Sequence, residues 1–107
     1  NQIQAINQFH VEHLAYLLGK FHEIKEGQSN LLESSTIVFG SNIGDGNRHN
    51  HEDLPTLVCG GGSGKLDQGV FKRFPKETPL ANLHLSLLGK MGVSVSTLGD
   101  STGVLPI

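Results

Sequence analysis

Two short apolar runs constrain the fold more than any other feature of the sequence. Residues 36–40 and 56–59 are almost continuously hydrophobic and rich in β-branched residues, a composition typical of strands that are buried on both faces. A helical pattern at residues 2–26 precedes the first run. A second helical pattern follows residues 56–59. Thr78 is its expected N-cap, and Pro79 stands at its first helical position. We therefore expect an α/β fold, in which a small, mainly parallel sheet is flanked by two helices.

The composition limits the chain to one domain and argues against several classes of function. The length of 107 residues suits a single α/β domain, residues 1–107. A hydrophobic fraction of 36% and a mean hydropathy of −0.14 argue against a membrane partner. The formal net charge of −2 removes the main support for a nucleic-acid partner. A single cysteine excludes an intrachain disulfide and a cysteine-based zinc site.

The first residues have the pattern of a helix and not of a signal peptide. Residues 1–6 contain neither a basic segment nor an apolar segment of the kind that starts an exported chain. An opening inside a helical pattern predicts a piece cut from a longer polypeptide. A natural start left by processing is the alternative.

The polar loop after the first apolar run is the best candidate for chemistry. Asp45, His49 and His51 lie close together in sequence, and imidazole with carboxylate suits Zn²⁺, Mn²⁺ or Fe. In open α/β sheets, ligands bind outside the carboxyl ends of the strands. If the loop is extended, His49 and His51 point to the same side. The alternative is a solvated loop whose histidines cap backbone groups.

The glycine-rich stretch at residues 60–65 invites a phosphate-loop interpretation, which fails on detail. Cys59 stands where that motif needs its first glycine, and Leu66 stands where it needs Ser or Thr. We therefore predict a structural turn here. Cys59 itself ends an apolar run, and we predict that it is buried and inert.

Several blocks together resemble the C-terminal part of an uncharacterised bacterial protein family, itself distantly similar to the alkaline phosphatase and sulfatase superfamily. The resemblance covers nearly the whole chain, and its motifs are specific as an ordered set. The blocks are Phe9-His10-Val11-Glu12-His13-Leu14, Phe39-Gly40-Ser41-Asn42, Gly44-Asp45-Gly46-Asn47, His49-Asn50-His51, Leu54-Pro55-Thr56-Leu57-Val58, Gly60-Gly61-Gly62, Thr78-Pro79-Leu80-Ala81-Asn82-Leu83 and Gly99-Asp100-Ser101-Thr102-Gly103.

The resemblance implies a partial alkaline-phosphatase-like fold with a degenerate site. An Asp-His pair of the superfamily is replaced here by Ser41-Asn42, and His51 or His49 matches a later histidine. The resemblance thus implies a cleft lined by Ser41, Asn42 and Asp53. No cofactor is expected in the isolated chain, and a divalent metal is expected only in the full-length protein. Relatives often begin with an export signal, so export is an expectation for the full-length protein alone.

Two functions follow from the resemblance. The first is a remnant of a metal-dependent hydrolase that is inactive in isolation. The second is a non-catalytic structural or binding module that kept the fold and lost the metal site. In both cases the N-terminal part of the same polypeptide supplies the remaining strands of the sheet. Without it the sheet keeps an unpaired edge, so we expect a homo-oligomer with two-fold symmetry, formed through the first helix or a sheet edge.

Overall fold

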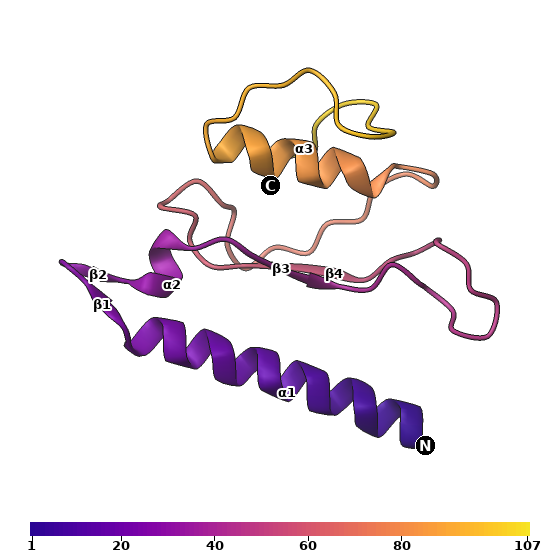
Figure 1. Ribbon diagram of the computed structural model, residues 1–107, viewed down its shortest axis with the longest axis horizontal. Coiled ribbons are helices and arrows are strands. Elements are labelled where there is room, and N and C mark those ends of the chain that lie inside the picture. Colours follow the sequence, from indigo (N-terminus) through magenta and orange to yellow (C-terminus); the bar gives the residue numbers. More distant parts are fainter.

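A computed structural model describes all residues from Asn1 to Ile107. Three helices and two separate two-stranded sheets follow one another along the chain (Figure 1). Their bounds are α1 (Gln2–Glu23), β1 (Lys25–Glu26), β2 (Ser29–Asn30), α2 (Leu31–Ser34), β3 (Ile37–Gly40), β4 (Thr56–Cys59) and α3 (Leu80–Lys90). No helix has both the length and the hydrophobicity needed to cross a membrane.

The first helix is shorter than its sequence pattern predicts. The side chain of Asn1 caps its N-terminus by accepting a hydrogen bond from the amide of Ile3 at 3.0 Å. The helix ends at Glu23 because Ile24 has an extended backbone. A tight hairpin of β1 and β2 follows, in which Gly27 takes a φ of 59°. Gly27 therefore forms the turn between β1 and β2 and does not end α1.

The expected parallel sheet is wrong, since β3 and β4 pair antiparallel. Ile37 lies opposite Cys59 and Gly40 lies opposite Thr56. Parallel neighbours need a crossover connection that returns the chain to the starting edge, usually through a helix. Residues 41–55 contain no helix and instead fold back on themselves with a bridge between Asp45 and Asn50. The connection is thus a long hairpin loop, and the fold is a mixture of α and β elements around antiparallel pairs.

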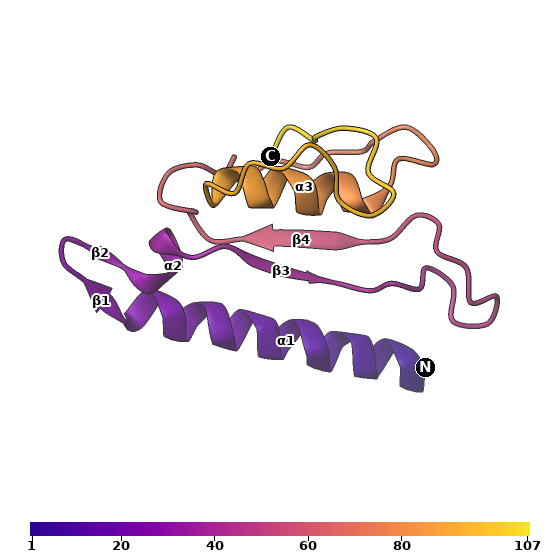
Figure 2. The same ribbon diagram turned by 45° about the horizontal axis from the view of Figure 1, so that its top comes forward.

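The two long helices lie on opposite faces of the β3–β4 pair. In Figures 1 and 2, α1 runs along one face and α3 along the other. Val38, Gly40 and Thr56 share one face of the pair because cross-strand neighbours point the same way. They line a cavity together with Leu80 and His84 of α3, so this face is the one beneath α3. The opposite face is turned toward α1.

The best-buried part of the chain is α3 with the C-terminal tail. Eight residues of the protein are buried, and five of them lie in α3. The amide of Asn82 donates to the hydroxyl of Thr102 at 3.1 Å, and its oxygen accepts from the Thr102 amide at 2.8 Å. The hydroxyl of Ser86 accepts from the amide of Leu105 at 2.6 Å. These bonds hold residues 102–105 against the helix.

Packing of α1 on the sheet is weaker than its apolar stripe predicts. Leu14 is buried and Phe21 is half-buried, but Leu17 is 42% exposed and Ile6 is 54% exposed. The reason is one of length. A helix of 22 residues spans about 33 Å, whereas a strand of four residues spans about 13 Å. The helical spacing of Ile6, Leu14, Leu17 and Phe21 predicts that all four pack on the sheet. The sheet covers only part of this stripe, so that prediction is wrong for Ile6 and Leu17.

Candidate functional site

The loop between β3 and β4 is an ordered turn built around Asp45. The Asp45 carboxylate accepts hydrogen bonds from the amides of Asn47 and Arg48, at 2.9 and 3.2 Å. The side chain of Asn50 accepts from the amide of Asp45 at 2.9 Å. The amide of His49 donates to the Asp45 carbonyl at 2.8 Å. Such Asx contacts are a common way for a short polar segment to satisfy its own backbone.

The turn separates the three side chains that sequence analysis assigned to a metal. His49 has a φ of 55°, so the extended conformation that would align it with His51 is absent. The Oδ1 atom of Asp45 accepts from the turn's own amides, and its Oδ2 atom lies 3.9 Å from the Nε of Arg48. No group of three or more His, Cys, Asp or Glu side chains in the structure is placed to hold a metal ion. As placed, the three side chains do not form a ligand set, and their metal role stays a prediction for the full-length protein.

His51 is held in a defined orientation. Its Nδ1 atom bonds to the carbonyl oxygen of Asn42. A carbonyl oxygen can only accept, so Nδ1 carries the proton in this arrangement and the Nε2 of the neutral ring is left as an acceptor. The contact ties the start of the loop to its far side.

A cavity lies where β3 runs into the loop. It has a volume of about 190 Å³ and lies between the sheet and the start of α3. Its polar lining consists of Ser41, Asn42, Thr56 and His84, and its apolar lining of Val38 and Leu80 with Gly40. Ser41 and Asn42 are the predicted cleft residues that the structure brings to this cavity. Asp53, at a φ of 51°, is not among the lining residues.

His84 is the member of the cavity that sequence analysis missed. It follows Leu80 by four residues on α3, so the two side chains lie on the same side of the helix. That spacing was visible in the sequence, but a histidine inside a leucine-rich helix gives no sign of which surface it will face. The hydroxyl of Ser41 donates its proton to the carbonyl of Ile43, so the Thr56 hydroxyl, the Asn42 amide and the His84 imidazole are the groups that can donate hydrogen bonds to a small polar molecule.

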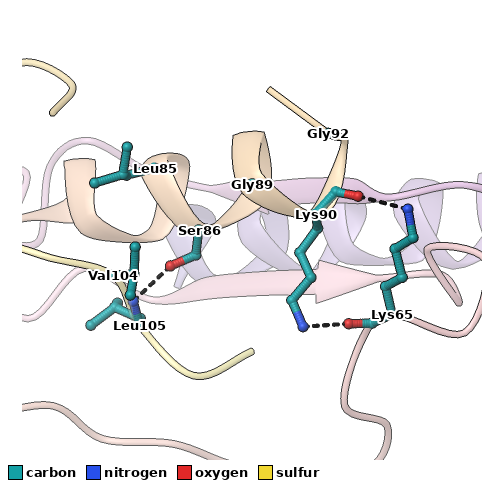
Figure 3. Close-up of a pocket in the computed structure, with 8 residues that line it drawn as sticks. All are labelled: Lys65, Leu85, Ser86, Gly89, Lys90, Gly92, Val104 and Leu105. Carbon is teal, nitrogen blue, oxygen red and sulfur yellow. Dashed lines mark hydrogen bonds between the residues drawn. The ribbon is translucent and has the colours of Figure 1, made fainter. Parts of the chain in front are cut away.

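A larger groove of about 400 Å³ lies at the other end of α3 (Figure 3). The ammonium group of Lys65 donates to the carbonyl of Lys90 at 3.0 Å, and that of Lys90 donates to the carbonyl of Lys65 at 2.6 Å. Lys90 is in the last turn of α3, where free carbonyl groups and the helix dipole favour cations. The two lysines therefore fasten the 60–70 segment to the helix end, which explains their positions without a ligand.

The glycine-rich turn has a structural role, as its sequence predicts. The amides of Gly61, Gly62 and Ser63 donate to carbonyl groups of residues 32–35 at 2.8 to 3.0 Å. A Cβ atom on Gly61 would lie 2.5 Å from the carbonyl oxygen of Glu33. The amides that a phosphate loop would offer to a ligand are thus occupied.

Comparison of the chain with protein-family models, curated proteins and solved structures gives no match. The resemblance to the alkaline phosphatase and sulfatase superfamily consequently stays a prediction, supported by the ordered motifs alone.

Proposed function

We propose that this chain is a structural module. In this proposal it contributes a helix, a pair of strands and a second helix to a larger α/β assembly, and it catalyses no turnover on its own. One observation carries the proposal: the β3–β4 pair lies between two long helices with both of its edges open (Figure 2). The proposed assembly is a sulfatase- or phosphatase-like protein, in keeping with the motifs described above.

The backbone of the two strands supports this proposal. Outside their own ladder, β3 and β4 make no backbone hydrogen bond, and no side chain bonds to them. Each strand therefore presents free amide and carbonyl groups along its outer edge. Isolated two-stranded sheets are marginal in water, and open edges are sites where further strands pair.

The exposed surface of the chain supports it as well. A compact monomer of this mass exposes roughly 5,800 Å², whereas this chain exposes 8031 Å². Its radius of gyration is 15.5 Å, against about 13 Å for a compact domain of this length. The surplus includes large apolar side chains of α1 and both strands, among them Ile3, Ile6, Val38 and Leu57. Surface of this kind marks interaction sites.

The hydrolase remnant is the second candidate, and the polar cavity at the end of β3 favours it. Ser41, Asn42 and His84 converge there, and the ring of His51 is fixed nearby by its bond to the Asn42 carbonyl. These groups suit the binding of a polar molecule. In this candidate the metal and the remaining catalytic groups belong to the rest of the full-length protein.

Activity measurements on the purified chain separate the two candidates. An aryl phosphate and an aryl sulfate are incubated with the chain, His51→Ala and His84→Ala, each with and without added Zn²⁺ and Mn²⁺. The structural module predicts that all three proteins give only the background rate. Turnover by the unmodified chain that falls to background in either variant would overturn the proposal in favour of the hydrolase.

A further inference from the structure

We propose that the module's partner is a second copy of this chain, which pairs with it antiparallel along the free edge of β3. The proposal rests on the proposed function and names the occupant of the open edge. Two β3 strands related by a two-fold axis would join the two hairpins into one four-stranded sheet. Each face of that sheet would carry two helices, α1 from both copies on one face and α3 from both copies on the other.

The chemistry of the two edges selects β3. Proteins protect exposed edges with proline, with charged residues and with bulges. β4 is entered through Pro55, which has no amide to donate. β3 and its flanking residues Thr36 and Ser41 contain no proline and no charge, and its pairing with β4 has no bulge. β3 is therefore the less protected of the two edges.

A second copy is the occupant that matches the size of the exposed surface. The surface of 8031 Å² exceeds that of a compact monomer by roughly 2,200 Å². Obligate dimers bury about 1,000 to 2,500 Å² on each partner. The surplus is thus of the size that one such interface removes.

Two-fold symmetry makes the same edge complementary to itself. In an antiparallel pair of identical strands, each outward amide of one copy lies opposite a carbonyl of the other. The interface is therefore isologous, and after dimerisation both edges of β3 are paired, so no third copy can add to this strand. The width also fits. Four strands at about 4.8 Å spacing give a sheet that two helices of about 10 Å diameter can cover.

The experiment compares two strand variants of similar exposure. Val38 of β3 is 40% exposed and Leu57 of β4 is 48% exposed, so a lysine can replace either side chain without being buried. Val38→Lys places a like charge on each copy near the proposed two-fold axis, while Leu57→Lys, the matched control, places it on the strand that is not used. Mass is measured by light scattering at tens of micromolar, and circular dichroism checks that both variants stay folded.

We expect the unmodified chain and Leu57→Lys to have twice the 11.5 kDa mass of one chain, and Val38→Lys to have the mass of a monomer. Hydrogen exchange of the unmodified chain supplies a test that needs no variant: residues 37–40 become protected as concentration rises, and residues 56–59 show no such rise.

A monomer at tens of micromolar overturns the proposal. So does a dimer that only Leu57→Lys breaks, or one that neither variant breaks. A monomer without turnover would reject this partner alone, whereas a dimer with turnover would reject the structural module.

Discussion

Asn82 is the residue whose replacement tests most directly how α3 holds the C-terminal tail. Its side chain is 5% exposed and forms two hydrogen bonds with Thr102, one to the hydroxyl and one from the backbone amide. No other hydrogen bond in the structure reaches either Thr102 atom. Asn82→Ala therefore breaks both bonds and leaves the partly buried amide of Thr102 without a partner.

The expected cost follows from these bonds. Each is worth about 0.5–1.5 kcal/mol net, so their loss costs about 1–3 kcal/mol. Alanine is the better helix former in the middle of α3, which returns up to ~0.7 kcal/mol. We expect Asn82→Ala to lower the free energy of unfolding by about 1–2 kcal/mol. Thr102→Val removes only the hydroxyl bond and should cost about 0.5–1 kcal/mol.

Urea unfolding of the two single variants and the double variant forms a thermodynamic cycle. If the two side chains act on each other, the double variant loses less than the sum of the single losses. Hydrogen exchange should show faster opening of residues 98–107 in Asn82→Ala, with α1 unaffected. An Asn82→Ala loss below about 0.5 kcal/mol, or strictly additive losses, would show that the tail is held by apolar contacts instead.

Two further predictions concern the turn after β4 and the end of that strand. Gly61→Ala should cost about 1–3 kcal/mol, because its Cβ would meet the Glu33 carbonyl; Gly46→Ala, which has open space, should be nearly neutral in the same urea titration. Burial raises the pKa of the Cys59 thiol, so at pH 7 it is protonated and should react with iodoacetamide more slowly in the folded chain than in the unfolded chain. The rate should climb as pH rises through the raised pKa, because the thiolate is the nucleophile. Equal rates for folded and unfolded chains at pH 7 would contradict this.

The sequence allows the existence of the main elements to be predicted but not the direction of the strands. Periodicity identifies the two long helices, and the apolar, β-branched runs identify β3 and β4. The expectation that both strands are buried on both faces is wrong, because β3 alternates between half-buried and exposed residues and Leu57 of the otherwise half-buried β4 is exposed. Direction depends on residues 41–55, where Asp45 and Asn50 fold the loop back on itself. Those contacts join polar residues that look, in sequence, like an ordinary solvated loop, so the parallel arrangement was expected.

The candidate site shows a similar division between what the sequence reveals and what it hides. The resemblance implies that Ser41 and Asn42 line a cleft, because they stand in place of its Asp-His pair, and both residues line the cavity. His49 was grouped with His51 on the assumption of an extended loop, and the positive φ of His49 removes that alignment. His84 joins the cavity from α3, a contact that depends on how the helix packs on the sheet and not on its own neighbours in sequence.

The open edge and the polar cavity are coupled, because the same strand forms both. Val38 and Gly40 line the cavity with one side of β3, while the free amides and carbonyls of β3 form the edge. Most of the buried residues lie in α3, and none lies in β3 or β4, so the hairpin belongs to the less stable part of the chain. A partner strand on β3 would add hydrogen bonds there and fix the position of Ser41 and Asn42. Any binding by the cavity should therefore strengthen on assembly, and by linkage a ligand in the cavity should favour the assembled state to the same degree.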